Sequence, residues 1–194
     1  MKKIKTLSLL FVACLFAVAS CGTKNSQDDS KEVAEEQNEE KFDDTNLEDD
    51  TDFAVQAADG GMLEVKAAEL ALSKGTSAKV KEFAQTIVAD HSKANEELKT
   101  LAQQKNITLP DSLSEKNQKK YEDLAEESGA DFDKAYCEFM VKDHKDDIDK
   151  FKKAADEAKD ADLKSWAAGK VPVLEHHLSL AQQMEESVKN SSTN

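Results

Sequence analysis

The chain contains four histidines, and they fall in three segments that have apolar residues at helical spacing. His91 occupies the apolar stripe of "IVADHSKANEEL" at residues 87–98, where neighbouring turns supply hydrocarbon side chains. His144 repeats this pattern in "MVKDHKDDI", and His176 and His177 follow in "VPVLEHHL". A neutral imidazole can ligate a metal ion or form hydrogen bonds inside a core. The pattern therefore poses a choice between a metal site and a buried polar network.

The histidines also occupy similar levels along the helices that the sequence predicts. Each lies near the middle of a helix, and antiparallel helices of similar length bring their midpoints to one level. Glu64 falls close to that level on the first long helix, beside a stripe of small residues that allows close helix approach. We therefore expect Glu64, His91, His144 and His177 to converge, with His176 as a substitute for His177. Imidazole and carboxylate suit zinc, copper, iron or nickel, so the expected cofactor is one divalent transition-metal ion.

Each histidine also has a purely structural interpretation. A single histidine on an apolar stripe commonly serves as a hydrogen-bonded packing residue. The alternative function is then a structural or protein-interaction lipoprotein, whose buried histidines form only a core polar network that responds to pH. Cys137 lies one heptad before His144 on the same helix face. We interpret this lone cysteine as a small buried hydrophobic residue rather than a metal ligand.

Enzymatic chemistry is disfavoured by the residues around the histidines. Di-iron carboxylate bundles carry Glu-x-x-His on two helices. The residues three positions before the four histidines are instead Val88, Val141, Val173 and Leu174, so iron oxidation and oxygen activation are not expected. The sequence also contains no recognisable nucleophile–base arrangement, glycine-rich phosphate loop or CxxC motif. We therefore expect a non-enzymatic protein.

The elements that must position these residues are helices throughout residues 51–194. The chain has two prolines, six glycines and little of the alternation typical of strands. Ser112 and Glu115 have the spacing of a capping box, and Pro172 predicts a kink in the last helix. The expected helices cover about residues 51–74, then a helix capped by Thr76 or Ser77 that reaches 105, then 115–128 and 131–159, and a last helix opened by Asp160 or Asp162 that reaches 188. Two long hairpins joined by a long connection predict an all-α fold: a ferritin-like four-helix bundle with one long crossover containing a short helix.

Several segments of this domain resemble a known bacterial family. They are "GGMLEVKAAELALSKGTSAKVKEFAQTIVADHSKANEELKTLA", "FDKAYCEFMVKDH" and "LKSWAAGKVPVLEHHLSLA". In them the chain is similar to the domain-of-unknown-function 4142 family, exported ferritin-like proteins sometimes labelled as outer membrane proteins. The likeness covers about residues 51 to 185. It implies the bundle fold, but it implies no activity because none is established for the family.

The first residues have the features of a lipoprotein signal. Residues 1–20 combine an N-terminal lysine cluster with the apolar run "LSLLFVACLFAVA", which is too short for a stable membrane anchor. The following "VASC" resembles the lipobox of bacterial lipoproteins, so we expect cleavage before Cys21 and acylation of that cysteine. The alternative is an ordinary secretory signal with an incidental cysteine. The expected location is the cell envelope, with lipid on Cys21 attaching the protein to the outer membrane, facing the periplasm or the cell surface.

Charge and composition define the segment between the lipid and the domain. Residues 21–50 are rich in acids and nearly devoid of apolar residues, so we expect a lipidated cysteine followed by a disordered acidic tether. The whole chain carries a net charge of −14. It contains no arginine, and nucleic-acid binding requires a basic surface, so nucleic-acid partners are excluded. The sequence identifies no protein partner.

Overall fold

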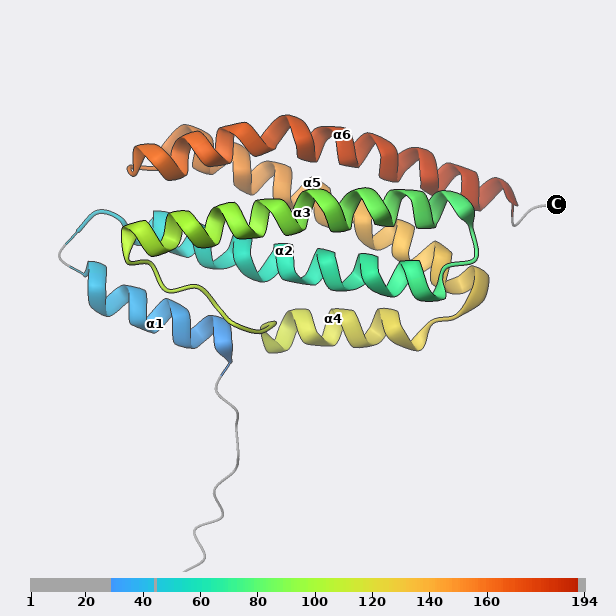
Figure 1. The fold of residues 1–194 in the computed structure, drawn as a ribbon, viewed down its shortest axis with the longest axis horizontal. Helices are drawn as coiled ribbons and strands as arrows, with labels where there is room; N and C mark the ends of the chain where they lie inside the picture. The colour runs from blue at the N-terminus through green and yellow to red at the C-terminus, as the bar shows by residue number, and fades with distance from the viewer. Residues whose placement is uncertain (1–28, 44, 192–194) are drawn as a thin grey trace, which may run out of the picture.

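The computed structural model describes residues 29–43 and 45–191 of the chain. All regular elements in these described ranges are helices, which confirms the predicted all-α class (Figure 1). The expected signal peptide at residues 1–20 and the lipidated Cys21 lie outside the described residues.

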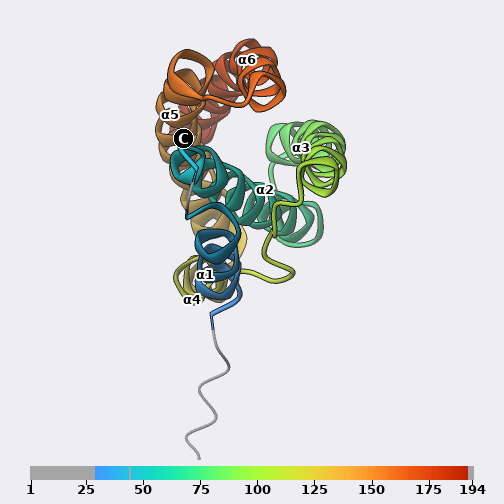
Figure 2. The same ribbon diagram turned by 90° about the vertical axis from the view of Figure 1, so that its left-hand side faces the viewer.

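Four long helices form the bundle, in the order that the sequence predicted. They are α2 (Glu48–Lys74), α3 (Ala78–Lys105), α5 (Gly129–Glu157) and α6 (Ala161–Ser191). Helices α2 and α3 form one hairpin and α5 and α6 the other, and the pairs meet through contacts of α2 with α5 and of α3 with α6. The long crossover contains the short helix α4 (Glu115–Glu126), which packs along the side of α2 and α5 (Figure 2).

Local signals in the sequence account for most of the helix ends. Asn106 adopts a left-handed conformation (φ 58°) and ends α3, as predicted. Helix α4 is capped by Ser114, whose hydroxyl accepts from the backbone N–H of Asn117, so the predicted capping role of Ser112 is wrong. Helix α6 continues through Pro172 as one element.

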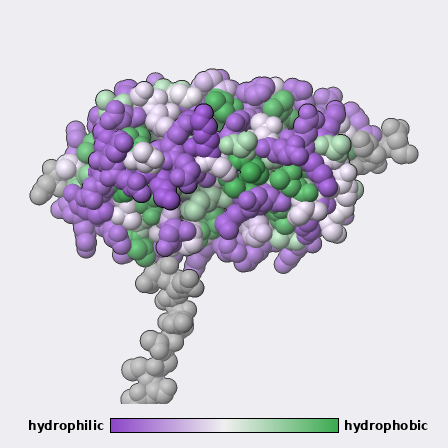
Figure 3. Space-filling model, viewed as in Figure 1, coloured by the Kyte–Doolittle hydropathy of each residue, from purple (hydrophilic) through white to green (hydrophobic). Residues whose placement is uncertain are grey.

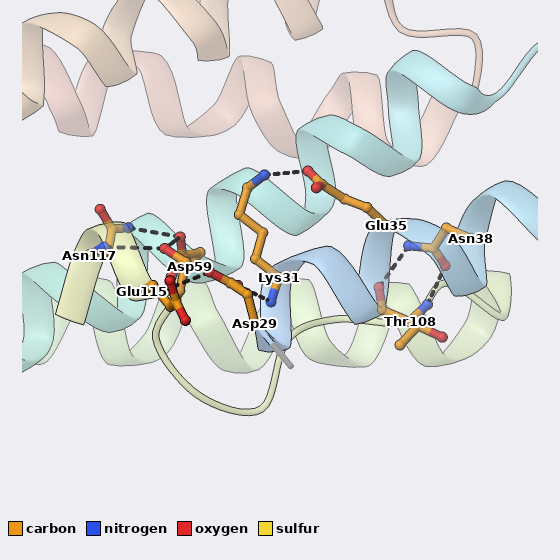
Figure 4. A network of polar contacts seen from close by, with 9 residues as sticks. Asp29, Lys31, Glu35, Asn38, Asp59, Thr108, Glu115 and Asn117 are labelled. Atoms are coloured by element: carbon orange, nitrogen blue, oxygen red, sulfur yellow. Dashed lines mark hydrogen bonds and ion pairs between the residues drawn. The ribbon is translucent and has the colours of Figure 1, made fainter. Parts of the chain in front are cut away.

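The prediction of a disordered tether is wrong for residues 29–42, which form a docked helix. Helix α1 (Ser30–Phe42) lies along α2 and the crossover (Figures 1 and 4). The amide of Asn38 pairs with the backbone of Thr108, donating to its carbonyl at 2.8 Å and accepting from its N–H at 2.7 Å. Asp29 accepts from the backbone of Lys31 and of Glu115 (Figure 4). These hydrogen bonds order a helix that buries little apolar surface, so apolar content alone gave no sign of it.

Three buried aspartates hold the connections between helices. Asp50, Asp59 and Asp133 are each less than 5% exposed. Asp50 accepts from the backbone N–H groups of Lys159 and Asp160, and Asp59 accepts from that of Ser114. Asp133 accepts from the backbone N–H groups of Thr76 and Ser77, and all of these bonds are 2.6–3.0 Å long. Each carboxylate therefore fixes a turn or a helix start from a distant part of the chain, because a charged acceptor strengthens these bonds.

The apolar core of the bundle has two ends separated by a polar layer. One cluster extends from Ala67 through Ile87 and Met140 to Met184, near the α2–α3 turn. The other end is packed by clusters around Leu98 and Phe151. Glu64, His91, His144 and His177 lie between these ends, each no more than 7% exposed. Figure 3 shows a mostly hydrophilic surface on this face of the molecule, whereas the four residues of the polar layer are buried.

Candidate metal centre

Three of the four histidines meet inside the bundle. One ring nitrogen of each of His91, His144 and His177 lies within 4.8 Å of the others. The ring centroid of His144 lies 5.5 Å from that of His91 and 5.5 Å from that of His177, and the centroids of His91 and His177 are 5.3 Å apart. His176 is exposed and lies outside this group, so it cannot substitute for its neighbour. The histidines come from α3, α5 and α6, and Glu64 of α2 contacts two of them.

Two of the rings have their tautomers fixed by oxygen acceptors. His144 Nδ1 lies 3.0 Å from the carbonyl oxygen of Met140, and a carbonyl can only accept, so Nδ1 carries the hydrogen. His177 Nε2 lies 3.0 Å from the carboxylate of Asp90 and donates to it. The remaining nitrogens, Nε2 of His144 and Nδ1 of His177, therefore carry lone pairs.

His91 joins Glu64 to His177 through both of its nitrogens. Its Nδ1 lies 2.8 Å from Glu64 Oε2, and its Nε2 lies 3.3 Å from His177 Nδ1. Burial raises the pKa of Glu64 well above its usual range, so the carboxyl group can hold a proton and donate it to Nδ1. When Glu64 is ionised instead, Nδ1 of His91 donates to it and Nε2 presents a lone pair. Transfer of the Glu64 proton to Nδ1, with loss of the proton on Nε2, thus turns Nε2 of His91 into a third potential ligand.

Burial keeps all three imidazoles neutral near pH 7. It lowers the pKa of His91, His144 and His177, because each ring is removed from water that would stabilise its charged form. Nearby carboxylates oppose this effect, Glu64 at His144 and Asp90 at His177. Neutral imidazole is the form that coordinates a metal.

One nitrogen–nitrogen distance in the cluster matches the spacing of ligands on a tetrahedral ion. Two nitrogens bound at about 2.0–2.1 Å to a tetrahedral ion lie about 3.3–3.4 Å from each other. The separation between Nε2 of His91 and Nδ1 of His177 is 3.3 Å. These two rings therefore have the spacing of two ligands on one ion.

Two atoms of the polar layer are buried without a hydrogen-bond partner. They are Nε2 of His144 and Oε1 of Glu64, in side chains that are 0% and 1% exposed. Buried polar atoms are nearly always paired, because leaving one unpaired costs about 1–3 kcal/mol. A metal ion bound here would use the free lone pair on Nε2 of His144.

Several carboxylates besides Glu64 surround the histidines. Asp90 binds His177 as described above. Asp143 and Asp147 form a buried group with Glu64, in which the three carboxylates lie within 4.8 Å of each other. Lysines neutralise part of this group, Lys150 at 2.7 Å from Asp147 and Lys120 at 3.3 Å from Asp143. The position of Asp147, close to one turn after His144, is the signal that could have identified it.

A small cavity borders the histidine cluster on the side of α3 and α6. Its volume is about 150 Å³, and His91, His177 and Glu64 contribute to its wall. The exposed side chains of Lys93 and Val173 also line it, so it reaches the surface.

Comparison with known proteins identifies the domain without identifying a function. The model of the family described as Domain of unknown function (DUF4142) matches residues 32–184, which confirms the resemblance seen in the sequence and extends it into α1. No curated protein and no solved structure matches the chain. Among the described residues, no helix combines the length and the apolar character needed to cross a membrane.

Proposed function

Because the chain belongs to the DUF4142 family, whose description assigns no activity, we propose a function from the site itself. The protein binds one divalent transition-metal ion through His91, His144 and His177, as a non-enzymatic lipoprotein of the cell envelope. The observation that supports this most directly is the convergence of one nitrogen from each of these buried rings within 4.8 Å.

The ring nitrogens that contact oxygen atoms, rather than one another, support the same assignment. Metal-ligating histidines usually donate their second N–H to a carbonyl or carboxylate, which fixes the tautomer and the ring orientation. Met140 and Asp90 provide such acceptors for His144 and His177. Glu64 provides one for His91 once the carboxyl group has ionised. In this assignment Glu64 orients a ligand and supplies negative charge beside the ion, rather than occupying a coordination position itself.

The chemistry of the ligands narrows the metal to a small group. Three imidazoles without thiolate or thioether favour zinc, copper, nickel or iron over magnesium and calcium, which prefer oxygen. Cys137 is buried, and it is absent from both groups of candidate ligands among the described residues. The ion would bring positive charge to a layer that already holds buried carboxylates, so binding also relieves their repulsion.

The alternative function, a structural polar network, has one observation in its favour. Glu64, His91, His177 and Asp90 form a continuous chain of polar contacts that is complete without a metal. This chain leaves Nε2 of His144 without a partner, however. A network selected only for stability would be expected to pair that atom or to replace it with a hydrocarbon.

The envelope location rests on the sequence of the N-terminus. The lipobox-like "VASC" at Cys21 supports lipid attachment, and residues 22–28 would connect the lipid to Asp29, where the described fold begins. Two or more acyl chains hold a protein stably on a membrane. The bundle would then bind its metal in the periplasm or at the cell surface.

Equilibrium dialysis and thermal unfolding test the metal site together. The purified protein should retain about one equivalent of Zn²⁺ or Cu²⁺, and a hundredfold excess of free metal over Kd should stabilise it by about 2.7 kcal/mol. His144→Leu should abolish both effects and leave the metal-free protein as stable or stabler, since an unpaired polar atom is removed.

His176→Leu is the matched control, because this exposed histidine directly precedes a proposed ligand. It should bind metal like the wild type. Loss of stability in His144→Leu with or without metal, together with no retained metal in the wild type, would support the structural network instead.

A further inference from the structure

The three proposed ligands leave one coordination position of a tetrahedral ion without a protein ligand. Structural zinc sites use four protein ligands, whereas sites with three keep a position for water or another small molecule. Glu64 is poorly placed to fill it, since its oxygens contact Nδ1 of His91 and of His144. Those nitrogens are on the opposite side of each ring from Nε2, which would face the metal.

The cavity beside α3 and α6 provides room for a ligand at this position. It holds about 150 Å³, space for a few water molecules at about 30 Å³ each. Two of the proposed ligands, His91 and His177, form part of its wall. Phe151, Trp166 and Leu174 contribute apolar surface, which limits the number of competing hydrogen bonds inside.

The charges around the cavity, together with the proposed metal, bear on the kind of ligand it would take. Lys93 and Lys170 both line the cavity, and both pair with Glu97, so this group carries one net positive charge. Three carboxyl groups line the cavity as well: Asp90, which accepts from neutral His177, Asp147, which pairs with Lys150, and Glu64. The wall itself therefore favours neither sign of charge, and the positive charge of a bound divalent ion supplies the preference for an anion.

We propose that the metal centre is open: its fourth position faces this cavity and takes one exchangeable ligand, either water-derived or a small monovalent anion. This inference rests on the proposed metal site and adds a second binding function to it. The apolar wall and the small volume restrict the ligand to a few non-hydrogen atoms. Anything larger would extend out of the cavity toward Lys93 and Val173 at the surface.

Azide titration of the copper-loaded protein tests the open position. Binding of azide to Cu²⁺ produces a new charge-transfer absorption band, and the band should saturate at about one azide per copper. Ala94→Leu adds an isopropyl group to the cavity wall and should weaken azide binding by about tenfold or more, with copper stoichiometry unchanged. Ala168→Leu, at an exposed position of α6, should behave like the wild type.

The outcomes separate this inference from the function on which it rests. Stoichiometric copper binding that is lost in His144→Leu, but without any azide band, would overturn the open site and leave the metal site standing. Absence of copper binding in the wild type would overturn both. If Ala94→Leu lowers copper binding itself, Val173→Phe at the mouth of the cavity carries the same test. Unchanged azide affinity in a copper-replete cavity variant would show that the ligand does not enter here.

Discussion

Each of the three buried histidines has one nitrogen held by an oxygen, and for His91 and His177 the other nitrogens face each other at 3.3 Å. The oxygens belong to three different groups: a helix carbonyl at Met140, an exposed carboxylate at Asp90 and the buried carboxyl group of Glu64. The histidines and the oxygen groups therefore have different roles in the proposed site. In the proposed site, the nitrogens that face the other rings would bind the ion, and the contacts to oxygen would set the ring orientation and the number of protons held.

Metal binding is predicted to release about one proton at neutral pH. Burial raises the pKa of Glu64, so the metal-free protein holds a proton that must leave when His91 coordinates. Affinity should therefore rise with pH through the range in which Glu64 titrates. Burial lowers the pKa of the three histidines. Protons should therefore compete with the metal for the imidazole nitrogens only below the pH range in which histidines usually titrate. Calorimetric titrations in two buffers with different ionisation enthalpies measure the release.

Glu64→Gln is the control for this proton count, since glutamine has no proton to lose. It should bind metal without proton release. Identical enthalpies in both buffers for the wild type, with an affinity independent of pH, would contradict the assigned role of Glu64.

Asp90→Ala is predicted to weaken metal binding by about tenfold to a hundredfold. The carboxylate holds the tautomer of His177 that leaves Nδ1 free, and loss of such partners typically costs this much affinity. Competition with a chromophoric chelator measures the change. Asp146→Ala removes an exposed acid of α5 as a control for net charge and should have little effect. Equal losses in the two variants would indicate a general electrostatic effect.

Cys137 is predicted to react slowly with thiol reagents in the folded protein. The side chain is 0% exposed, and burial raises its pKa to about 12, so almost no thiolate is present at neutral pH. Labelling should become fast only in denaturant. Rapid labelling under native conditions would place this face of α5 at the surface.

The sequence could predict which residues meet but not how they pair. The helical period places His91, His144 and His177 on inward stripes, and helix lengths place them and Glu64 at one level. Adjacent helical residues differ by about 100° in direction, so the choice between His176 and His177 depends on the rotation of α6. The contact between Asp90 and His177 crosses from α3 to α6, and no local pattern records it.

At the scale of the elements, the long helices were predictable and α1 was not. Asn106 ends α3 and Gly129 begins α5 in the left-handed region (φ 58° and 60°), through backbone preferences that act locally. Helix α1 depends instead on the pairing of Asn38 with the crossover residue Thr108, seventy positions away. Composition describes what a segment can bury, and it cannot describe a hydrogen bond to a distant backbone.

Asn38→Ala is therefore predicted to release α1 without affecting the metal site. Two hydrogen bonds are lost and the backbone of Thr108 is left unpaired, a cost of about 1–3 kcal/mol that α1 has little apolar burial to offset. Limited proteolysis should cut within residues 30–46 faster, while metal stoichiometry stays unchanged. The exposed Glu36→Ala of the same helix should resist cleavage like the wild type. Unchanged protection in Asn38→Ala would assign the docking to other contacts.

At the scale of the whole molecule, we propose an acidic helical bundle that is attached to a membrane through lipid on Cys21. Cys21→Ala should move the protein from the membrane fraction to the soluble fraction and abolish fatty-acid labelling, because acyl chains supply the anchoring free energy. Fractionation with a Cys137→Ala control separates lipid loss from a general effect of removing a thiol. A variant that stays in the membrane fraction to the same extent would contradict the lipobox interpretation.

X-ray absorption at the metal edge of the zinc- or copper-loaded protein tests the central claim most directly. The account predicts three imidazole rings with metal–nitrogen distances of about 2.0–2.1 Å, plus one light ligand that azide can replace. In His144→Leu the imidazole count should fall, and in His176→Leu it should remain. A shell of oxygen ligands without imidazole scattering, or one that contains sulfur, would contradict a metal centre built from His91, His144 and His177.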